Sequence, residues 1–233
     1  MTLRILVLSP VLVMQALFVV LRASRLPEAA GPRYGTLGVG PELRLLVLGD
    51  SSAAGVGVAH QDAALAGRLA TTLGVRYRVS WRVIAASGAT VASILKTLED
   101  VPPQKYNFVV VALGVNDAKN GVSLTSWEQR YETLLDLVKE KFSPDRVCVT
   151  GVPPLRHFPL LPAPLSNVIG DRAALFDAYL AKCCAARKGV VHLPFGSPPT
   201  TDDLAPDGFH PNARTYLEWA NRAIAKAWDS NDQ

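Results

Sequence analysis

The strongest constraint on this fold is a regular alternation of apolar runs with amphipathic segments of helical period. Residues 43–48 and 106–113 are almost continuously apolar, as expected for strands buried on both faces of a sheet. Residues 125–142 instead place their apolar side chains on one helical face. The pattern predicts strands at 43–48, 77–85, 106–113, 146–152 and 190–193, and helices at 61–73, 90–98, 125–142, 171–188 and 211–228.

Strict alternation of this kind requires crossover connections, which are right-handed within one sheet. We therefore expect an α/β fold, a three-layer α/β/α sandwich around a parallel sheet of about five strands. The composition, 49% hydrophobic and 19% charged, suits one folded domain and argues against disorder or a coiled coil. We expect this domain at residues 41–233, after an N-terminal segment and connector at residues 1–40.

The charge distribution argues against a nucleic-acid partner. Four arginines and one glutamate give the first 40 residues a charge of +3, which leaves only +1 of the total +4 for the rest. No basic stripe interleaved with aromatic residues is present there. The three cysteines form neither a CxxC pair nor a disulfide framework, so we expect buried thiols, no metal site and no cofactor.

An apolar segment of 17 residues begins at Ile5 and ends at Leu21, at the lower edge of the length of a membrane span. Arg22 and Arg25 follow it, and no small-x-small cleavage site is evident, which favours an uncleaved membrane anchor over a cleaved signal. We expect a membrane-anchored or exported, periplasmic protein. Positive residues flank both ends of the segment, so a domain on the cytoplasmic face of the membrane stays an alternative. A second alternative is that the segment forms a helix packed on the domain.

Polar or small residues follow the predicted strands, at the sheet edge where ligands bind in such folds. Ser51 lies in a small-residue turn after the first strand, where it is either a nucleophile or a helix N-cap. Gly88 follows the second strand, where its N–H can point at a ligand, or the turn is an ordinary one. Asn116 follows the third strand and can donate a side-chain N–H to the same point.

Asp207 and His210 precede the last predicted helix. Three residues apart on a turn, the carboxylate can accept from the imidazole Nδ1–H and leave Nε2 outward as a base. With Ser51, Gly88 and Asn116 they make the inventory of a serine hydrolase: nucleophile, base, orienting acid and oxyanion donors.

The combination of motifs resembles the SGNH hydrolase superfamily, also called GDSL esterases and lipases. The resemblance covers about residues 43–228, and the blocks stand in the family's order and near its spacing. Ser52 occupies a variable position where the commonest family motif has Leu. The blocks read Gly49-Asp50-Ser51, Gly88, Gly114-Val115-Asn116-Asp117 and Asp207-Gly208-Phe209-His210.

The resemblance implies a flavodoxin-like sandwich and a role for each matching residue. Ser51 becomes the nucleophile, His210 the general base and Asp207 the residue that orients it. The N–H groups of Ser51 and Gly88 and the side chain of Asn116 become the oxyanion hole, and neither a metal nor a cofactor is implied. The resemblance gives no role to the other histidines, His60, His157 and His192. Ser52 competes with Ser51 for the role of nucleophile only because it is adjacent.

A Pro-rich apolar segment at 153–165 suggests an acyl-chain wall, although a loop tucked onto the core fits it equally. We expect a serine hydrolase of small or lipid esters with short to medium acyl chains, acting through an acyl-enzyme. The alternatives are a lysophospholipase or acyl-thioesterase at a membrane surface, a carbohydrate deacetylase and a non-catalytic flavodoxin-like binding module. The sequence leaves the oligomeric state open. The expected wall comprises Leu155, Phe158, Leu160 and Leu161.

Overall fold

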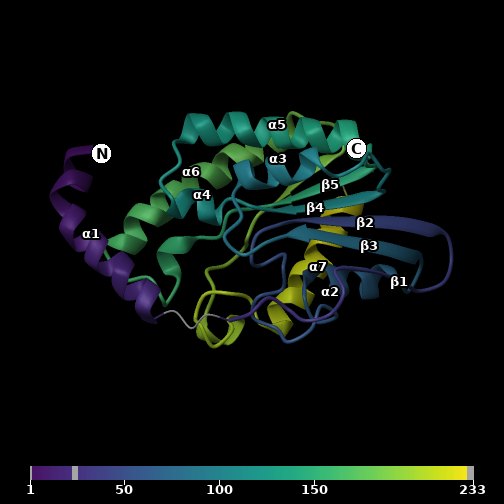
Figure 1. Ribbon diagram of the computed structural model, residues 1–233, viewed down its shortest axis with the longest axis horizontal. Helices are drawn as coiled ribbons and strands as arrows, with labels where there is room; N and C mark the ends of the chain where they lie inside the picture. The colour runs from purple at the N-terminus through teal and green to yellow at the C-terminus, as the bar shows by residue number, and fades with distance from the viewer. Residues whose placement is uncertain (1, 23–25, 230–233) are drawn as a thin grey trace.

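A computed structural model describes residues 2–22 and 26–229 of the chain. It contains a six-stranded sheet in the order β1-β3-β2-β4-β5-β6, in which β2 to β6 run parallel (Figure 1). The five expected strands are therefore present, and a short antiparallel edge strand, β1, joins them from the connector before residue 41. The strands are β1 (Tyr34–Leu37), β2 (Glu42–Gly49), β3 (Arg78–Ala85), β4 (Phe108–Ala112), β5 (Arg146–Thr150) and β6 (Val190–Leu193).

Helices cover both faces of the sheet, which confirms the three-layer α/β/α architecture. Helices α2 (Leu65–Leu73) and α7 (Ala213–Asp229) pack together on one face. The opposite face is covered by α3 (Val91–Glu99), α5 (Leu124–Phe142) and α6 (Leu165–Ala185), as Figure 1 shows. Three shorter elements lie near the strand ends: α4 (Val115–Lys119) and the 3₁₀ turns η1 (Leu155–His157) and η2 (Thr201–Asp203).

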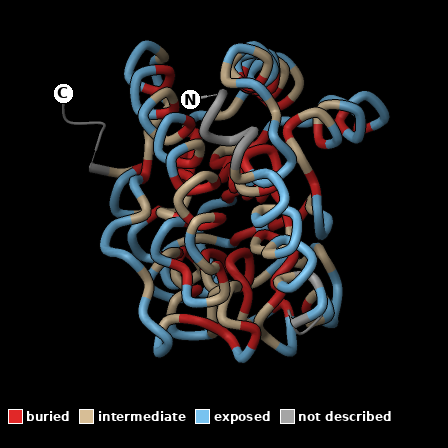
Figure 2. The backbone as a smooth tube through the Cα atoms, turned by 90° about the vertical axis from the view of Figure 1, so that its left-hand side faces the viewer, coloured by how far each residue is buried: buried red, intermediate tan, exposed pale blue. Residues whose placement is uncertain are grey.

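Each of the five parallel strands supplies side chains to two separate cores, which explains the continuous apolar runs in the sequence. In β2, Leu46 and Leu48 face the α3/α5/α6 layer, whereas Leu45 and Val47 face the α2/α7 layer. Buried residues accordingly lie along the middle of the molecule in Figure 2, with exposed residues outside them. The sheet is thus held rigidly from both sides, and the turns at its carboxyl edge are anchored to it.

Helix α6 begins at Leu165, earlier than the expected residue 171, and the Pro-rich segment 153–165 that leads into it contains the 3₁₀ turn η1. The close approach of η1 makes a small residue necessary inside this helix. A Cβ placed on Gly170 would lie only 2.7 Å from the Cβ of Arg156. Residues 153–165 are therefore not a single loop, because their turn η1 packs closely against α6.

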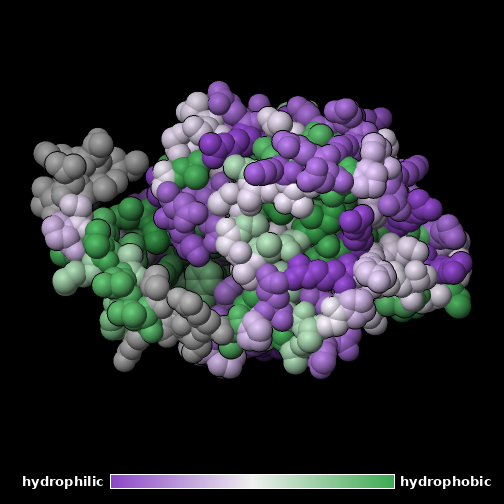
Figure 3. All heavy atoms as spheres, in the orientation of Figure 1, coloured by the Kyte–Doolittle hydropathy of each residue, from purple (hydrophilic) through white to green (hydrophobic). Residues whose placement is uncertain are grey.

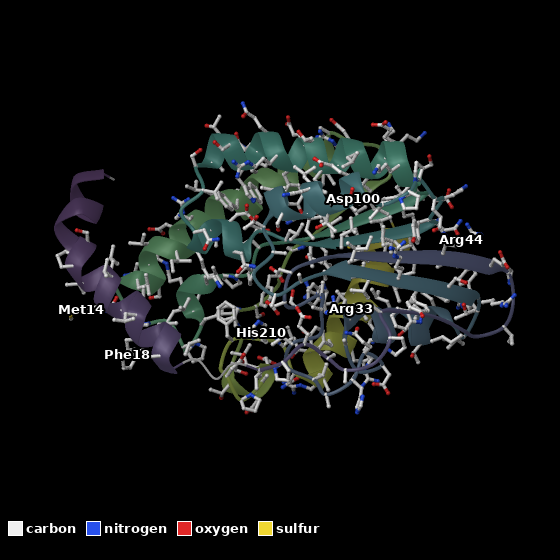
Figure 4. All side chains as sticks on the ribbon, in the orientation of Figure 1. Met14, Phe18, Arg33, Arg44, Asp100 and His210 are labelled. Carbon is white, nitrogen blue, oxygen red and sulfur yellow. The ribbon has the colours of Figure 1, made fainter. Side chains whose placement is uncertain are left out.

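Helix α1 (Thr2–Arg22) projects from the body of the molecule (Figure 1). Gln15 ties it to the start of α6: its amide donates to the Ala163 carbonyl at 2.7 Å and accepts from the Leu165 N–H at 3.0 Å. Met14 and Phe18 point away from the body, and the helix surface is largely apolar (Figures 3 and 4). Among the described residues, no helix combines the length and hydropathy that a membrane span requires.

Candidate active site

A chain of hydrogen bonds connects three side chains at the carboxyl edge of the sheet. The Nε2 atom of His210 lies 2.9 Å from the Oγ of Ser51, in the turn that follows β2. The Nδ1 atom of His210 lies 2.5 Å from Oδ2 of Asp207, in the turn that precedes α7. Figure 4 shows His210 beyond the end of the strands. The arrangement suits proton transfer from a hydroxyl to an imidazole held by a carboxylate.

Asp207 is buried and held in its ionised form by its own turn. Burial alone would raise its pKa, but hydrogen bonds from the His210 ring and from the backbone N–H groups of His210 and Phe209 outweigh that effect. The pKa of the Asp207 carboxyl therefore lies below its usual value. An ionised carboxylate accepts from Nδ1–H and so keeps Nε2 as the acceptor that faces Ser51.

The two adjacent serines have different partners. The hydroxyl of Ser52 donates to Oδ1 of Asp50 at 2.9 Å, and its N–H donates to the same atom at 3.0 Å. Burial raises the pKa of the Asp50 carboxyl, while these hydrogen bonds and the charges of His210 and Lys119 oppose the rise. Of the two hydroxyls, only that of Ser51 faces the imidazole.

Tyr216, on α7, holds the turn that contains Ser51 and Ser52. Its buried hydroxyl lies 2.8 Å from the Ser52 carbonyl and 2.7 Å from the Val56 carbonyl, both of which accept from it. This contact was not predictable from the sequence, because a tyrosine on the inner face of an amphipathic helix is ordinarily a core residue.

The backbone N–H groups of Ser51 and Gly88 are free to bind an acceptor. Within residues 2–22 and 26–229, neither the N–H of Ser51 nor that of Gly88 donates to a protein acceptor. Gly88 has a φ of +81°, and nothing lies within 4 Å of the position that a Cβ would take there. The left-handed conformation thus turns the peptide toward open space, a geometry that a side chain would both strain and obstruct.

The side chain of Asn116 and that of Asp117 bind the turn that contains Gly88. Asn116 Nδ2 donates to the Ala89 carbonyl at 2.9 Å, which leaves its second N–H for another acceptor. Asp117 Oδ2 accepts from the N–H of Val91 at 3.1 Å. These two bonds fix the β4–α4 turn against the β3–α3 turn, and thereby set the distance between the donors that the two turns supply.

Burial of the Asp117 carboxylate is electrostatically unfavourable. Asp117 is fully buried, and its Oδ1 has no partner among the described residues. Burial raises its pKa to about 6, although the N–H of Val91 and the charge of Arg130 act in the opposite direction.

A cavity of about 490 Å³ opens beside Ser51 and His210. Phe158 lines it, but Leu155 and Leu161 do not, because both are buried in the core between α5 and α6. Leu160 also lies outside the lining, with its Cβ 4.0 Å from where a Cβ on Gly208 would stand. Only Phe158 of the expected acyl wall therefore faces the cavity. Its other apolar lining includes Val115, Leu193, Pro194, Phe195 and Phe209.

These features coincide with a known family. The model of the GDSL-like lipase/acylhydrolase family matches residues 47–217, a range that contains Ser51, Asp207 and His210. The chain belongs to this family. It is accordingly a hydrolase of carboxylic esters, as the sequence predicted. A search of curated protein sequences gave no match.

Solved structures of esterases and lipases share the fold of this GDSL hydrolase. It is similar to TesA, with a TM-score of 0.60 and 20% identity over 78% of this chain and 97% of the other. It is also similar to the psychrotrophic esterase EstA from Pseudoalteromonas sp., with a TM-score of 0.60 and 13% identity over 82% and 99%. For phospholipase A1 from Streptomyces albidoflavus NA297 the TM-score is 0.59 and the identity 18%, over 78% of this chain and 98% of the other.

The remaining histidines of this GDSL hydrolase lie outside the Ser51–His210 chain of hydrogen bonds. His192 contacts Asp177 at 2.8 Å, while His60 and His157 are exposed. The three cysteines are free and buried. The described part of the chain holds no cluster of side chains suited to a metal ion.

Proposed function

We propose that this hydrolase cleaves esters of short to medium acyl chains through a Ser51–His210–Asp207 triad. The observation that carries the proposal is the continuous hydrogen-bonded chain from Ser51 Oγ through the His210 imidazole to Asp207. Membership of the GDSL family supports it, since the matched range contains all three residues.

In the proposed mechanism, Ser51 Oγ attacks the ester carbonyl while His210 Nε2 takes its proton. The negative charge on the carbonyl oxygen is stabilised by the N–H groups of Ser51 and Gly88 and by the Asn116 amide. His210 then gives the proton to the leaving alcohol, which leaves the acyl group on Ser51. Water, activated by the same imidazole, hydrolyses this acyl-enzyme.

The size of the cavity supports the proposed acyl range. Its volume of about 490 Å³ lies within the range of small-molecule sites, and Phe158, Phe195 and Phe209 give it an apolar lining. Because Ser51 and His210 line the cavity, an acyl chain bound there can present its carbonyl to the nucleophile. A long chain would extend beyond it into solvent.

A series of p-nitrophenyl esters of increasing chain length tests the proposal. We expect kcat/KM to peak at a short or medium chain, and Ser51→Ala to abolish turnover while circular dichroism stays that of the native fold. Ser52→Ala is the matched variant and should still turn over the esters. A Ser51→Ala protein of near-native activity would rule out the triad.

A second candidate, a lysophospholipase or acyl-thioesterase at a membrane surface, is favoured by α1. Val13, Met14 and Leu21 on this helix are 67%, 70% and 76% exposed, an arrangement that suits insertion into a lipid interface. We propose that α1 holds the enzyme on a membrane, on the exported side. Flotation of the full chain with liposomes should succeed, and a Met14→Glu/Leu17→Glu variant should stay in solution. Equal flotation of both would contradict a role for α1.

A further inference from the structure

We propose that Lys119 binds an anionic group on the alcohol half of the ester substrate. This proposal rests on the proposed function and names the class of substrate that the site prefers. The shared chemistry is a phosphate or carboxylate a few atoms from the ester oxygen, which a lysophospholipid or an ester of a hydroxy acid would supply.

The position of Lys119 on α4 directs it to the mouth of the active site. Val115 lines the cavity, and Lys119 lies four residues further along the same helix, so both are on one helical face. The Lys119 ammonium lies 5.5 Å from the centroid of the Phe209 ring. That ring lines the cavity and lies 5.3 Å from the His210 ring. The cation therefore stands at the edge of the catalytic site.

Helix α6 holds α4 in this position through Arg172. Arg172, on α6, donates through Nε to the Ala118 carbonyl at 3.1 Å and through Nη2 to the Val122 carbonyl. The end of the helix is thus fixed before any substrate binds, which reduces the conformational entropy lost when Lys119 binds an anion.

The charge of the buried Asp50 acts on Lys119 only from beyond ion-pair distance. Lys119 forms no ion pair with any carboxylate in the described ranges 2–22 and 26–229. The negative groups closest to the nucleophile are otherwise engaged, since Asp207 binds His210 and the buried Asp50 binds Ser52. Burial around the ammonium lowers the pKa of Lys119, and the charge of Asp50 opposes this.

A substrate anion would complete this site. The Lys119 side chain is exposed and its ammonium packs over the Phe209 ring, so an incoming anion can reach it without displacing another carboxylate. With the acyl chain in the apolar cavity, we place the alcohol half of the ester beside Phe209, the lining residue over which Lys119 lies. The contact made there is with the leaving group and does not involve the oxyanion donors.

The test compares three decanoyl esters below their micelle concentrations: the neutral monoglyceride, its 3-phosphate and the ester of glyceric acid. We expect wild type to prefer an anionic ester, and Lys119→Met to lower the ratio of anionic to neutral kcat/KM by about tenfold, chiefly through KM. Lys119→Arg should restore the ratio, and the two anionic arms show whether phosphate or carboxylate is bound. Lys139→Met, an exposed lysine on α5, is the control and should leave the ratio at the wild-type value.

Two results would overturn the proposal. One is a wild-type enzyme that hydrolyses the neutral ester as well as the anionic ones, and the other is a Lys119→Met variant with an unchanged ratio. Both leave the proposed function intact, because the neutral ester is still cleaved. Failure of wild type on all three esters and on the p-nitrophenyl series would instead reject the proposed function itself.

Discussion

Replacing Asp117 by Asn tests whether a buried carboxylate opposes folding at neutral pH. The pKa of Asp117 is raised to about 6 in the folded protein, against an ordinary value of 3.8. The folded state holds the Asp117 proton more tightly than the unfolded state does. The stabilisation of the folded state that results is complete below pH 4 and is lost as the pH rises to 6. At 1.36 kcal/mol for each pH unit of difference, the loss is about 3 kcal/mol.

The Asn side chain can still accept from the N–H of Val91 through its Oδ1, but it carries no charge. We therefore expect the free energy of unfolding of Asp117→Asn, relative to that of wild type, to rise by up to about 3 kcal/mol between pH 4 and pH 7. Urea unfolding of both proteins at the two pH values measures this difference. Asp62→Asn, at an exposed position, is the control and should track wild type at both pH values. A difference between Asp117→Asn and wild type that does not change with pH would refute the reasoning.

Three further changes address the site. Asn116→Ala should lower kcat by about 10² to 10³ with little change in KM, since one oxyanion donor is lost, and steady-state kinetics would show a ground-state role if KM rose instead. Asp207→Asn removes the acceptor for Nδ1–H of His210, so kcat should fall by up to about 10⁴. The low pKa of the Asp207 carboxyl keeps it ionised from about pH 5 to 9. A general base must be unprotonated to take the Ser51 proton, so kcat/KM of wild type should rise with pH, and a flat profile would contradict this. Tyr216→Phe leaves the carbonyls of Ser52 and Val56 without their donor and should cost about 1 to 3 kcal/mol, measured by urea unfolding; an unchanged midpoint would show that the turn does not depend on it.

The parallel strands and the helices between them were predictable because burial on both faces leaves continuous apolar runs. Strand β1 was missed for a physical reason: Tyr34–Leu37 is short, alternates between exposed and half-buried residues and pairs only along one edge with β3. Its sequence therefore resembles a connector, and only the register with β3 defines it.

The positions of candidate site residues were predictable where a residue type and its place after a strand were sufficient, as for Ser51 and Asn116. Roles that depend on which elements pack together were not predictable. The hydrogen bond from Val91 to Asp117 joins two turns that are distant in sequence. Leu155 and Leu161 looked like pocket residues, yet the packing of η1 against α6 buries both in the core.

Activation of Ser51 by His210 and Asp207 is tested by labelling the folded full chain with a fluorophosphonate, followed by intact-mass measurement and peptide mapping. We expect one adduct per chain, on Ser51, absent in Ser51→Ala and formed far more slowly in His210→Ala. An adduct on Ser52, or labelling of His210→Ala at the wild-type rate, would contradict this activation.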